Sequence, residues 1–181
     1  MPTYFIGLIF EPEQSIAKEI QNLQKILIEN ELVNPKKVVK PEKLHLTLKY
    51  IGIINDEALK RIKDEISKLK FENFDIQIAP VIRFFGADKR EPLLALDVKN
   101  SENLQNLIIK IENVTNKYFN DLKKRPFAGH LSIVTRDKKH KKINLENLNK
   151  SLEKIINPKN FEFKISKINL VKSENGKYII L

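Results

Sequence analysis

The apolar residues of this chain form the same series of periodic segments twice. This duplication constrains the fold more than any other feature of the sequence. Spacings of three and four residues predict helices, and alternation of apolar with polar residues predicts half-buried strands. The first copy predicts, in order, strand 4–10, helix 15–28, strand 44–51, helix 56–69 and strand 74–84. The second predicts strand 93–98, helix 102–119, strand 130–135, helix 144–156 and strand 161–171, before a terminal strand over 178–181. A duplicated β-α-β-α-β unit is therefore predicted, with halves of about 1–88 and 92–181.

Local signals support the boundaries of these segments. Asn55, followed by two acidic residues, is typical of a helix start, because its side chain can accept a hydrogen bond from the first turn. The strand alternation after Phe161 changes phase beyond Ser166, which predicts a bulge or a break there. The charged stretch 88–92 ends in Pro92 and is the expected hinge between the copies.

These elements predict an α+β fold, with residues 1–181 forming a single bilobal domain. Each of two pseudo-symmetric lobes should hold an antiparallel sheet with helices packed on its outer face, and the lobes should enclose a central cleft. No linker in the sequence is long enough to make the two halves independent domains.

Charge and cysteine content narrow the classes of function. The chain has 33 Lys and Arg against 23 Asp and Glu, a formal net charge of +10, which favours a polyanionic partner. A general richness in lysine explains the same charge without nucleic acid, so this alternative stays open. The absence of cysteine excludes disulfides, thiolate zinc sites and cysteine nucleophiles, and agrees with a cytoplasmic location. No apolar run reaches the length of a membrane span, so no membrane association is predicted.

The strongest chemical signal is a pair of matching tetrapeptides. Two of the three histidines begin the segments His45-Leu46-Thr47-Leu48 and His130-Leu131-Ser132-Ile133, and each segment lies on the middle strand of its own copy. Residues i and i+2 of a strand share a face, so each strand should offer an imidazole beside a hydroxyl. If the copies face each other, two imidazoles and two hydroxyls converge in one cleft.

Such a cleft suits phosphoryl chemistry. An imidazole titrates near neutral pH, so one can accept a proton from water while the other donates one to a leaving oxygen. The hydroxyls can donate hydrogen bonds to phosphate oxygens as charge develops there. Two alternatives remain: polar residues on the solvent face of an amphipathic strand, and a metal site. The sequence shows no His-Glu-x-x-His pattern or other clustered ligand spacing, so we predict neither a metal nor a cofactor.

The two motifs resemble those of the two-histidine (2H) phosphoesterases, and the chain is most similar to their RNA 2′,3′-cyclic phosphodiesterases, also called 2′-5′ RNA ligases. The resemblance includes the first strand, residues 41–52 and the segment 125–127 that leads to His130. It implies that His45 is the proton donor to the leaving 3′ oxygen, and that His130 is the proton acceptor that activates water. It also implies substrate binding by Thr47, Ser132 and Arg136.

The second motif departs from the usual family pattern at three positions. Gly129 stands where a proline usually precedes the histidine, Ser132 replaces the commoner threonine, and Arg136 lies one place later than the usual basic residue. Serine keeps the hydroxyl. The residues alone do not choose which histidine is the acid and which the base.

The resemblance implies metal-independent hydrolysis of RNA 2′,3′-cyclic phosphate ends to 2′-phosphomonoesters. We expect a monomeric enzyme, with tRNA fragments among its RNA partners. The reverse chemistry would join such an end to a 5′-hydroxyl. Two alternatives stay open: a 2H enzyme acting on a small cyclic nucleotide, and a non-catalytic module that binds RNA ends.

Other residues carry weaker signals. The basic run 138–142, which contains His140, is either a solvated loop or a surface that attracts an RNA backbone. Phe84, Phe85 and Phe127 are expected in the core rather than on a base-stacking surface. Tyr50 is five residues from His45, which predicts that it lies on the opposite strand face, in the core.

Overall fold

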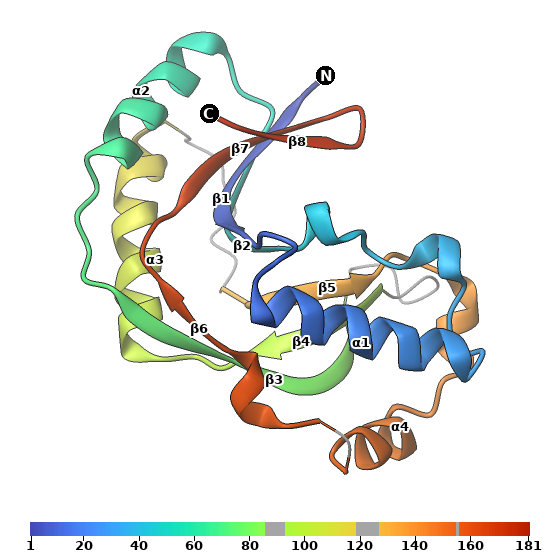
Figure 1. Cartoon of the computed structure of the whole chain (residues 1–181). Helices are drawn as coiled ribbons and strands as arrows, with labels where there is room; N and C mark the ends of the chain where they lie inside the picture. Colours follow the sequence, from blue (N-terminus) through green and yellow to red (C-terminus); the bar gives the residue numbers. More distant parts are fainter. Residues whose placement is uncertain (86–92, 119–126, 155) are drawn as a thin grey trace.

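A computed structural model describes residues 1–85, 93–118, 127–154 and 156–181 of the chain (Figure 1). In chain order, the elements are β1 (Thr3–Ile9), α1 (Ser15–Glu29), β2 (His45–Gly52), α2 (Asp56–Ser67), β3 (Phe74–Phe85), β4 (Leu93–Val98), α3 (Glu102–Thr115), β5 (His130–Val134), α4 (Leu145–Leu152), β6 (Glu162–Ile165), β7 (Asn169–Glu174) and β8 (Lys177–Ile180). Short 3₁₀ turns occupy Pro35–Lys37, Pro41–Lys43, Asn116–Tyr118, Lys138–Lys142 and Pro158–Phe161. The predicted hinge at 88–92 lies outside the described residues.

All eight strands belong to one antiparallel sheet, in the order β6-β3-β4-β5-β2-β1-β7-β8. The sheet is weakest at its centre, where β5 and β2 are paired only through Leu131 and Leu46. We call this junction the seam. It separates a β5 half (β6, β3, β4 and β5) from a β2 half (β2, β1, β7 and β8). The predicted α+β fold class is confirmed.

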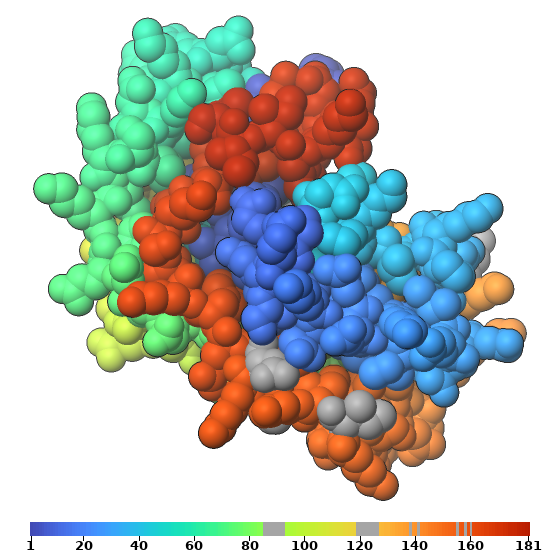
Figure 2. Space-filling model, viewed as in Figure 1, coloured from blue at the N-terminus to red at the C-terminus, as the bar shows by residue number. Residues whose placement is uncertain are grey.

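The helices divide between the two halves of the sheet. Helix α1 contacts β5 and α4 contacts β3, whereas α3 contacts both β2 and α2. Figure 1 accordingly shows α2 and α3 together on one side of the molecule and α1 and α4 on the other. Figure 2 shows α1 on the near surface, with the C-terminal hairpin β7–β8 above it.

Each half of the sheet takes strands from both halves of the sequence. Strand β3 belongs to the first copy but lies beside β4 of the second, and β7 of the second copy lies beside β1 of the first. The chain crosses from one end of the sheet to the other between β6 and β7, at residues 166–168. The break predicted there from the change of strand phase is confirmed. The assignment of one domain to residues 1–181 stays a prediction.

Side-chain caps explain where three helices begin. Asn55 accepts a hydrogen bond from the Ala58 amide at 2.8 Å, as its sequence context predicts. Ser101 and Asn144 cap α3 and α4 in the same way. Each cap satisfies an amide that has no partner within its helix.

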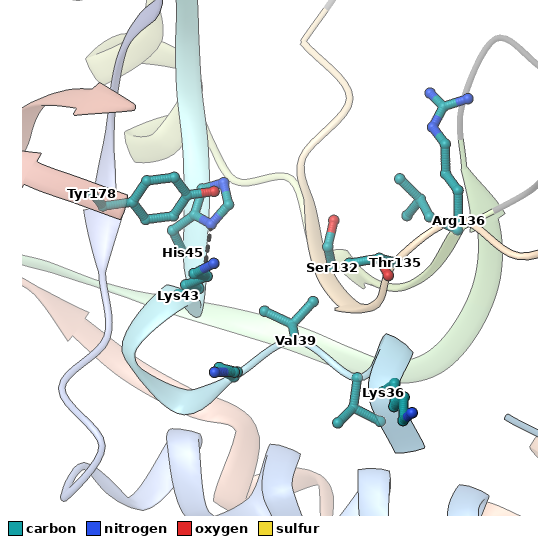
Figure 3. Close-up of a pocket in the computed structure, with 11 residues that line it drawn as sticks. Lys36, Val39, Lys43, His45, Ser132, Thr135, Arg136 and Tyr178 are labelled. Atoms are coloured by element: carbon teal, nitrogen blue, oxygen red, sulfur yellow. Dashed lines mark hydrogen bonds between the residues drawn. The ribbon is translucent and has the colours of Figure 1, made fainter. Parts of the chain in front are cut away.

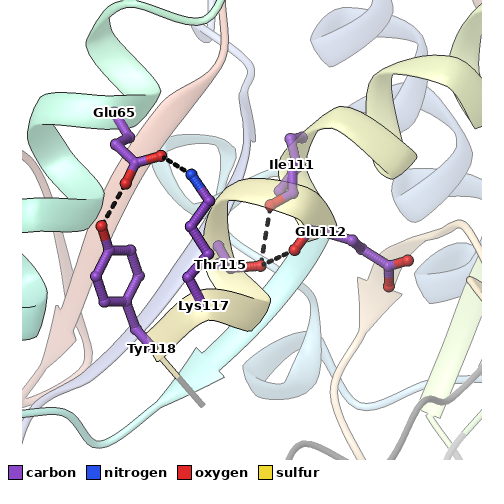
Figure 4. A network of polar contacts seen from close by, with 6 residues as sticks. All are labelled: Glu65, Ile111, Glu112, Thr115, Lys117 and Tyr118. Carbon is purple, nitrogen blue, oxygen red and sulfur yellow. Dashed lines mark hydrogen bonds and ion pairs between the residues drawn. The ribbon is translucent and has the colours of Figure 1, made fainter. Parts of the chain in front are cut away.

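A polar network fixes α2 to the end of α3 (Figure 4). Glu65 of α2 accepts hydrogen bonds from the hydroxyl of Tyr118 and from Lys117 at 2.9 Å. The bond from Tyr118 is the largest cause of a lowered pKa for the Glu65 carboxyl. Lys49 of β2 donates to Glu112 of α3 at 2.9 Å, which ties the same helix to the strand that carries the first motif.

The prediction that Tyr50 lies in the core is wrong, because its side chain is 58% exposed. The pairing of β1 with β2 shifts register twice, between Tyr4 and Phe5 and between Ile6 and Gly7. Such irregularities change which face a residue occupies. Leu48 and Ile51 are both buried although they are three residues apart, so the simple alternation does not hold across Tyr50.

Candidate active site

The two predicted motifs meet at the seam. Leu46 and Leu131 are directly paired there and are completely buried. Continuing this antiparallel register by one residue in each direction sets His45 opposite Ser132 and Thr47 opposite His130. These four side chains alternate with the buried leucines and are partly exposed, so they share the other face of the sheet.

Both imidazoles are anchored in the same way. Nδ1 of His45 lies 2.8 Å from the carbonyl oxygen of Lys43, and Nδ1 of His130 lies 3.0 Å from that of Ala128. A carbonyl oxygen can only accept, so each Nδ1 carries the proton and donates it to the residue two places earlier in the chain. In both rings Nε2 is then the nitrogen that can exchange a proton with a substrate.

His45 lies in an aromatic enclosure. The ring of Phe5 is 5.0 Å from the imidazole, and Tyr178 of β8 meets it edge-on at 5.0 Å. Burial among these rings is the main cause that lowers the pKa of His45 below its ordinary value of 6.5. The hydrogen bond to Lys43 opposes this decrease in pKa, and the nearby charge of His130 adds to it.

His130 has polar neighbours instead. It pairs with Asp97 of β4, whose Oδ2 lies 2.6 Å from Nε of Arg83 on β3. Directly paired residues share a face, so an ion pair lies beside His130 where aromatic rings lie beside His45. The pseudo-symmetry of the sequence is therefore broken in the surroundings of the two histidines.

A pocket of about 500 Å³ opens beside His45 (Figure 3). Its lining includes three of the predicted site residues, His45, Ser132 and Arg136. Thr47 and His130 share the same sheet face but do not belong to this lining. The remaining described residues of the lining are Lys36, Val38, Val39, Lys40, Lys43, Leu93, Thr135 and Tyr178.

The segment between α1 and β2 forms one wall of this pocket and is fastened to the end of β5. The Val39 amide donates to the Ile133 carbonyl at 2.9 Å, and the Thr135 amide donates to the Lys37 carbonyl at 2.7 Å. Buried Gln24 of α1 donates to the carbonyl oxygens of both Val39 and Ile133, each at 2.8 Å. The wall therefore has a fixed position relative to the second motif.

Two glycines allow close packing next to the motifs. Gly7 of β1 pairs with Thr47, and a Cβ atom there would collide with the carbonyl oxygen of Leu46. At Gly129, a Cβ atom would lie 2.8 Å from the ring of Phe127. The glycine that replaces the usual proline thus makes room for Phe127, which packs against the core as predicted.

Sequence reasoning missed part of the pocket lining. Lys36, Lys40 and Lys43 belong to a stretch dense in lysine just before the first motif, and this density was an available signal. Nothing in the sequence pairs Tyr178 with His45. The basic run 138–142 lies in a 3₁₀ turn in which His140 is completely buried, whereas Lys139 and Lys142 are exposed. Phe84 is 40% exposed, contrary to the prediction that it lies in the core.

Within the described ranges, no group of three or more His, Cys, Asp or Glu side chains is arranged to hold a metal ion. No helix in the same ranges has both the length and the apolar character needed to cross a membrane.

Comparisons with solved structures agree with the fold. E. coli LigT in its apo form aligns with a TM-score of 0.69 and 18% identity, over 99% of this chain and 94% of that chain. E. coli LigT complexed with 3′-AMP aligns with a TM-score of 0.70 and 18% identity, over 100% of this chain and 96% of that chain. TT0787 of Thermus thermophilus gives a TM-score of 0.65 at 18% identity, over 99% of this chain and 94% of that chain.

Comparisons of sequence identify the family. An RNA 2′,3′-cyclic phosphodiesterase of Archaeoglobus fulgidus is 36% identical over 64 residues, which span 35% of this chain and 36% of that protein. The match therefore spans about a third of the relative's length. The model of the 2′-5′ RNA ligase superfamily matches residues 12–177. Since that match includes both histidine motifs and nearly the whole chain, the protein belongs to the 2′-5′ RNA ligase superfamily.

Proposed function

We propose that this protein hydrolyses RNA 2′,3′-cyclic phosphate ends to 2′-phosphomonoesters, with His45 and His130 as its acid–base pair. The observation that carries the proposal is the meeting of the two motifs on one face of the seam, with both imidazoles anchored through Nδ1. Membership of the superfamily and the similarity to the A. fulgidus phosphodiesterase support it.

Each of the two Nε2 atoms carries out one proton transfer. Neutral His130 accepts a proton from a water molecule, whose oxygen forms a bond to phosphorus. The bond from phosphorus to the 3′ oxygen breaks, and protonated His45 donates its proton to that oxygen. The products are a 2′-phosphate and a free 3′-hydroxyl. The resemblance supports this assignment of acid and base. The burial of His45 disfavours its protonated form, so the assignment rests on the resemblance and not on the surroundings of the rings.

The hydroxyls and Arg136 act on the phosphate. Thr47 and Ser132 donate hydrogen bonds to its non-bridging oxygens, where negative charge increases as water attacks. Arg136 lines the pocket together with His45 and Ser132, so its guanidinium can bind phosphate despite its shifted position in the sequence.

Further parts of the proposal concern partners and location. The reaction needs neither a metal nor a cofactor, and the protein acts as a monomer in the cytoplasm on RNA ends, including those of tRNA fragments. If a 5′-hydroxyl attacks in place of water, the same groups produce a 2′-5′ linkage, so weak ligation accompanies hydrolysis.

The direct test is conversion of an oligonucleotide that ends in a 2′,3′-cyclic phosphate, with EDTA present and the 2′- and 3′-phosphate products resolved. We expect the wild-type protein to produce the 2′-phosphate alone. Conversion of cyclic mononucleotides without conversion of the oligonucleotide would favour the small-nucleotide alternative. Binding without any conversion across about pH 5 to 9 would favour the non-catalytic module.

The pH dependence of kcat/KM should reflect the lowered pKa of the enclosed His45. A proton donor must be protonated in the free enzyme, so kcat/KM falls as pH rises through its pKa. Because burial lowers the pKa of His45, we expect this decline to begin below pH 6.5. A pH profile on a cyclic mononucleotide measures it.

A variant of Tyr178 tests whether the aromatic enclosure causes the lowered pKa of His45. Tyr178→Leu removes the edge-on ring and admits water to His45, so the alkaline decline should move toward higher pH. If His45 were the base instead, the acidic side of the profile would move. A profile that Tyr178→Leu leaves unshifted would contradict the role given to the enclosure.

A further inference from the structure

The pocket beside His45 has a strongly cationic lining. Lys36, Lys40, Lys43 and Arg136 all belong to it, and no carboxylate of the described residues does. None of the ion pairs between described residues involves any of the four. Charges of one sign around a concave surface attract an anion more strongly than the same charges spread over a surface.

The four cations come from two segments that are fixed to each other. Figure 3 shows Lys36 and Lys43 on the segment before β2, and Arg136 beside Ser132 and Thr135 at the end of β5. The hydrogen bonds of Val39 to Ile133 and of Thr135 to Lys37 join these segments. An anion bound between them therefore does not have to order the backbone that presents the charges, which removes part of the cost of binding.

The two ends of the pocket differ in chemistry. His45 and Ser132 line it at the seam, where the reacting cyclic phosphate is placed by the proposed function. Lys36 lines it away from His45 (Figure 3), and nothing in the proposed chemistry requires Lys36 or Lys40. A nucleotide carries its 2′,3′-cyclic phosphate and its 5′ substituent on opposite sides of the ribose. A volume of about 500 Å³ is of the size that holds a small-molecule ligand.

We propose that Lys36 and Lys40 form a second anion subsite, which binds the phosphate on the 5′ side of the terminal nucleotide. The inference rests on the proposed function for the placement of the reacting phosphate. The subsite makes the enzyme select a nucleotide within a chain over a free cyclic nucleotide, because only the former carries a 5′ phosphodiester.

The first experiment measures kcat/KM for adenosine 2′,3′-cyclic phosphate and for a dinucleotide that ends in the same cyclic nucleotide. We expect wild type to prefer the dinucleotide by roughly tenfold or more, the size of one charged hydrogen bond. The double variant Lys36→Gln/Lys40→Gln should lose most of this preference. Lys63→Gln is the matched control, since Lys63 is an exposed lysine of α2 outside the pocket.

The preference should also depend on salt. Contacts to phosphate are weakened by salt, so the advantage of the dinucleotide should shrink as ionic strength rises in wild type. The double variant should show a smaller salt dependence. Equal kcat/KM for the two substrates in wild type, or an undiminished preference in the double variant, would overturn the inference.

A second measurement needs no turnover and separates the subsite from the proposed function. It compares the affinities for adenosine 2′-monophosphate and adenosine 2′,5′-bisphosphate by calorimetry. We expect the 5′-phosphate to strengthen binding by roughly tenfold in wild type and much less in the double variant. If this gain appears but no cyclic substrate is converted, the subsite stands and the proposed function fails. If cyclic substrates are converted and the gain is absent, the proposed function stands and the subsite fails.

Discussion

His45→Ala and His130→Ala are each expected to lower kcat on a 2′,3′-cyclic phosphate end by about 10²- to 10⁴-fold, the contribution of one general acid or base. Each change removes the Nε2 atom that carries a proton in the proposed mechanism. Because the two imidazoles act in one step, the double variant should be little worse than the poorer single variant. Rates are compared under single-turnover conditions, so that product release does not hide the effect.

Binding and folding controls decide how this loss is interpreted. The affinity for a 2′-phosphate product should fall far less than kcat, since the hydroxyls and the cations remain. Thermal unfolding of both variants shows whether the sheet is intact, and Lys63→Gln gives the reference rate. Full activity in either histidine variant would contradict the acid–base assignment for that residue.

Removal of a motif hydroxyl should also lower kcat strongly. Thr47→Val keeps the branched shape of the side chain, and Ser132→Ala removes a single oxygen, so both changes delete a donor with little change in packing. We expect a loss of about 10²- to 10³-fold in kcat for each, the usual result of removing one donor to a developing oxyanion. Steady-state kinetics on a cyclic mononucleotide measures the effect.

Conservative exchanges give the control for this prediction. Ser132→Thr installs the commoner residue of the family and keeps the hydroxyl, so its kcat should stay near that of wild type. Thr47→Ser should behave in the same way. A loss on Ser132→Thr as large as that on Ser132→Ala would show that packing, rather than hydrogen bonding, accounts for the effect.

The candidate site was largely predictable because it depends on local periodicity. Alternation along a strand places His45 with Thr47 and His130 with Ser132, and the duplication suggests that the two pairs meet. Both statements need only the backbone geometry of a strand. The aromatic enclosure of His45 was not predictable in this way, since Tyr178 reaches it through a pairing between strands that are distant in the sequence.

The same distinction between local periodicity and long-range pairing explains which parts of the fold were predictable. Helix and strand boundaries follow from caps and periods, and the phase change after Ser166 correctly marked a break. The order of strands in the sheet depends on pairings that no local period records, so the exchange of β3 and β7 between the halves was missed. Tyr50 was misplaced because two register shifts lie between β1 and β2. The lysines of the pocket wall lie in an irregular segment, where no period distinguishes a binding residue from a solvated one.

The position of β1 has a consequence for how the protein folds. Strand β1 lies between β2 and β7, and its register joins residues 3–7 to residues 169–173. Contacts so far apart in sequence form slowly, because a long loop must close before any pairing energy is gained. Until β7 pairs with β1, one edge of β1 is unpaired, and Tyr178 on the strand after β7 is not held beside His45. A nascent chain therefore carries both histidine motifs long before it can hold them in a finished site, and the competent enzyme is a late product of folding.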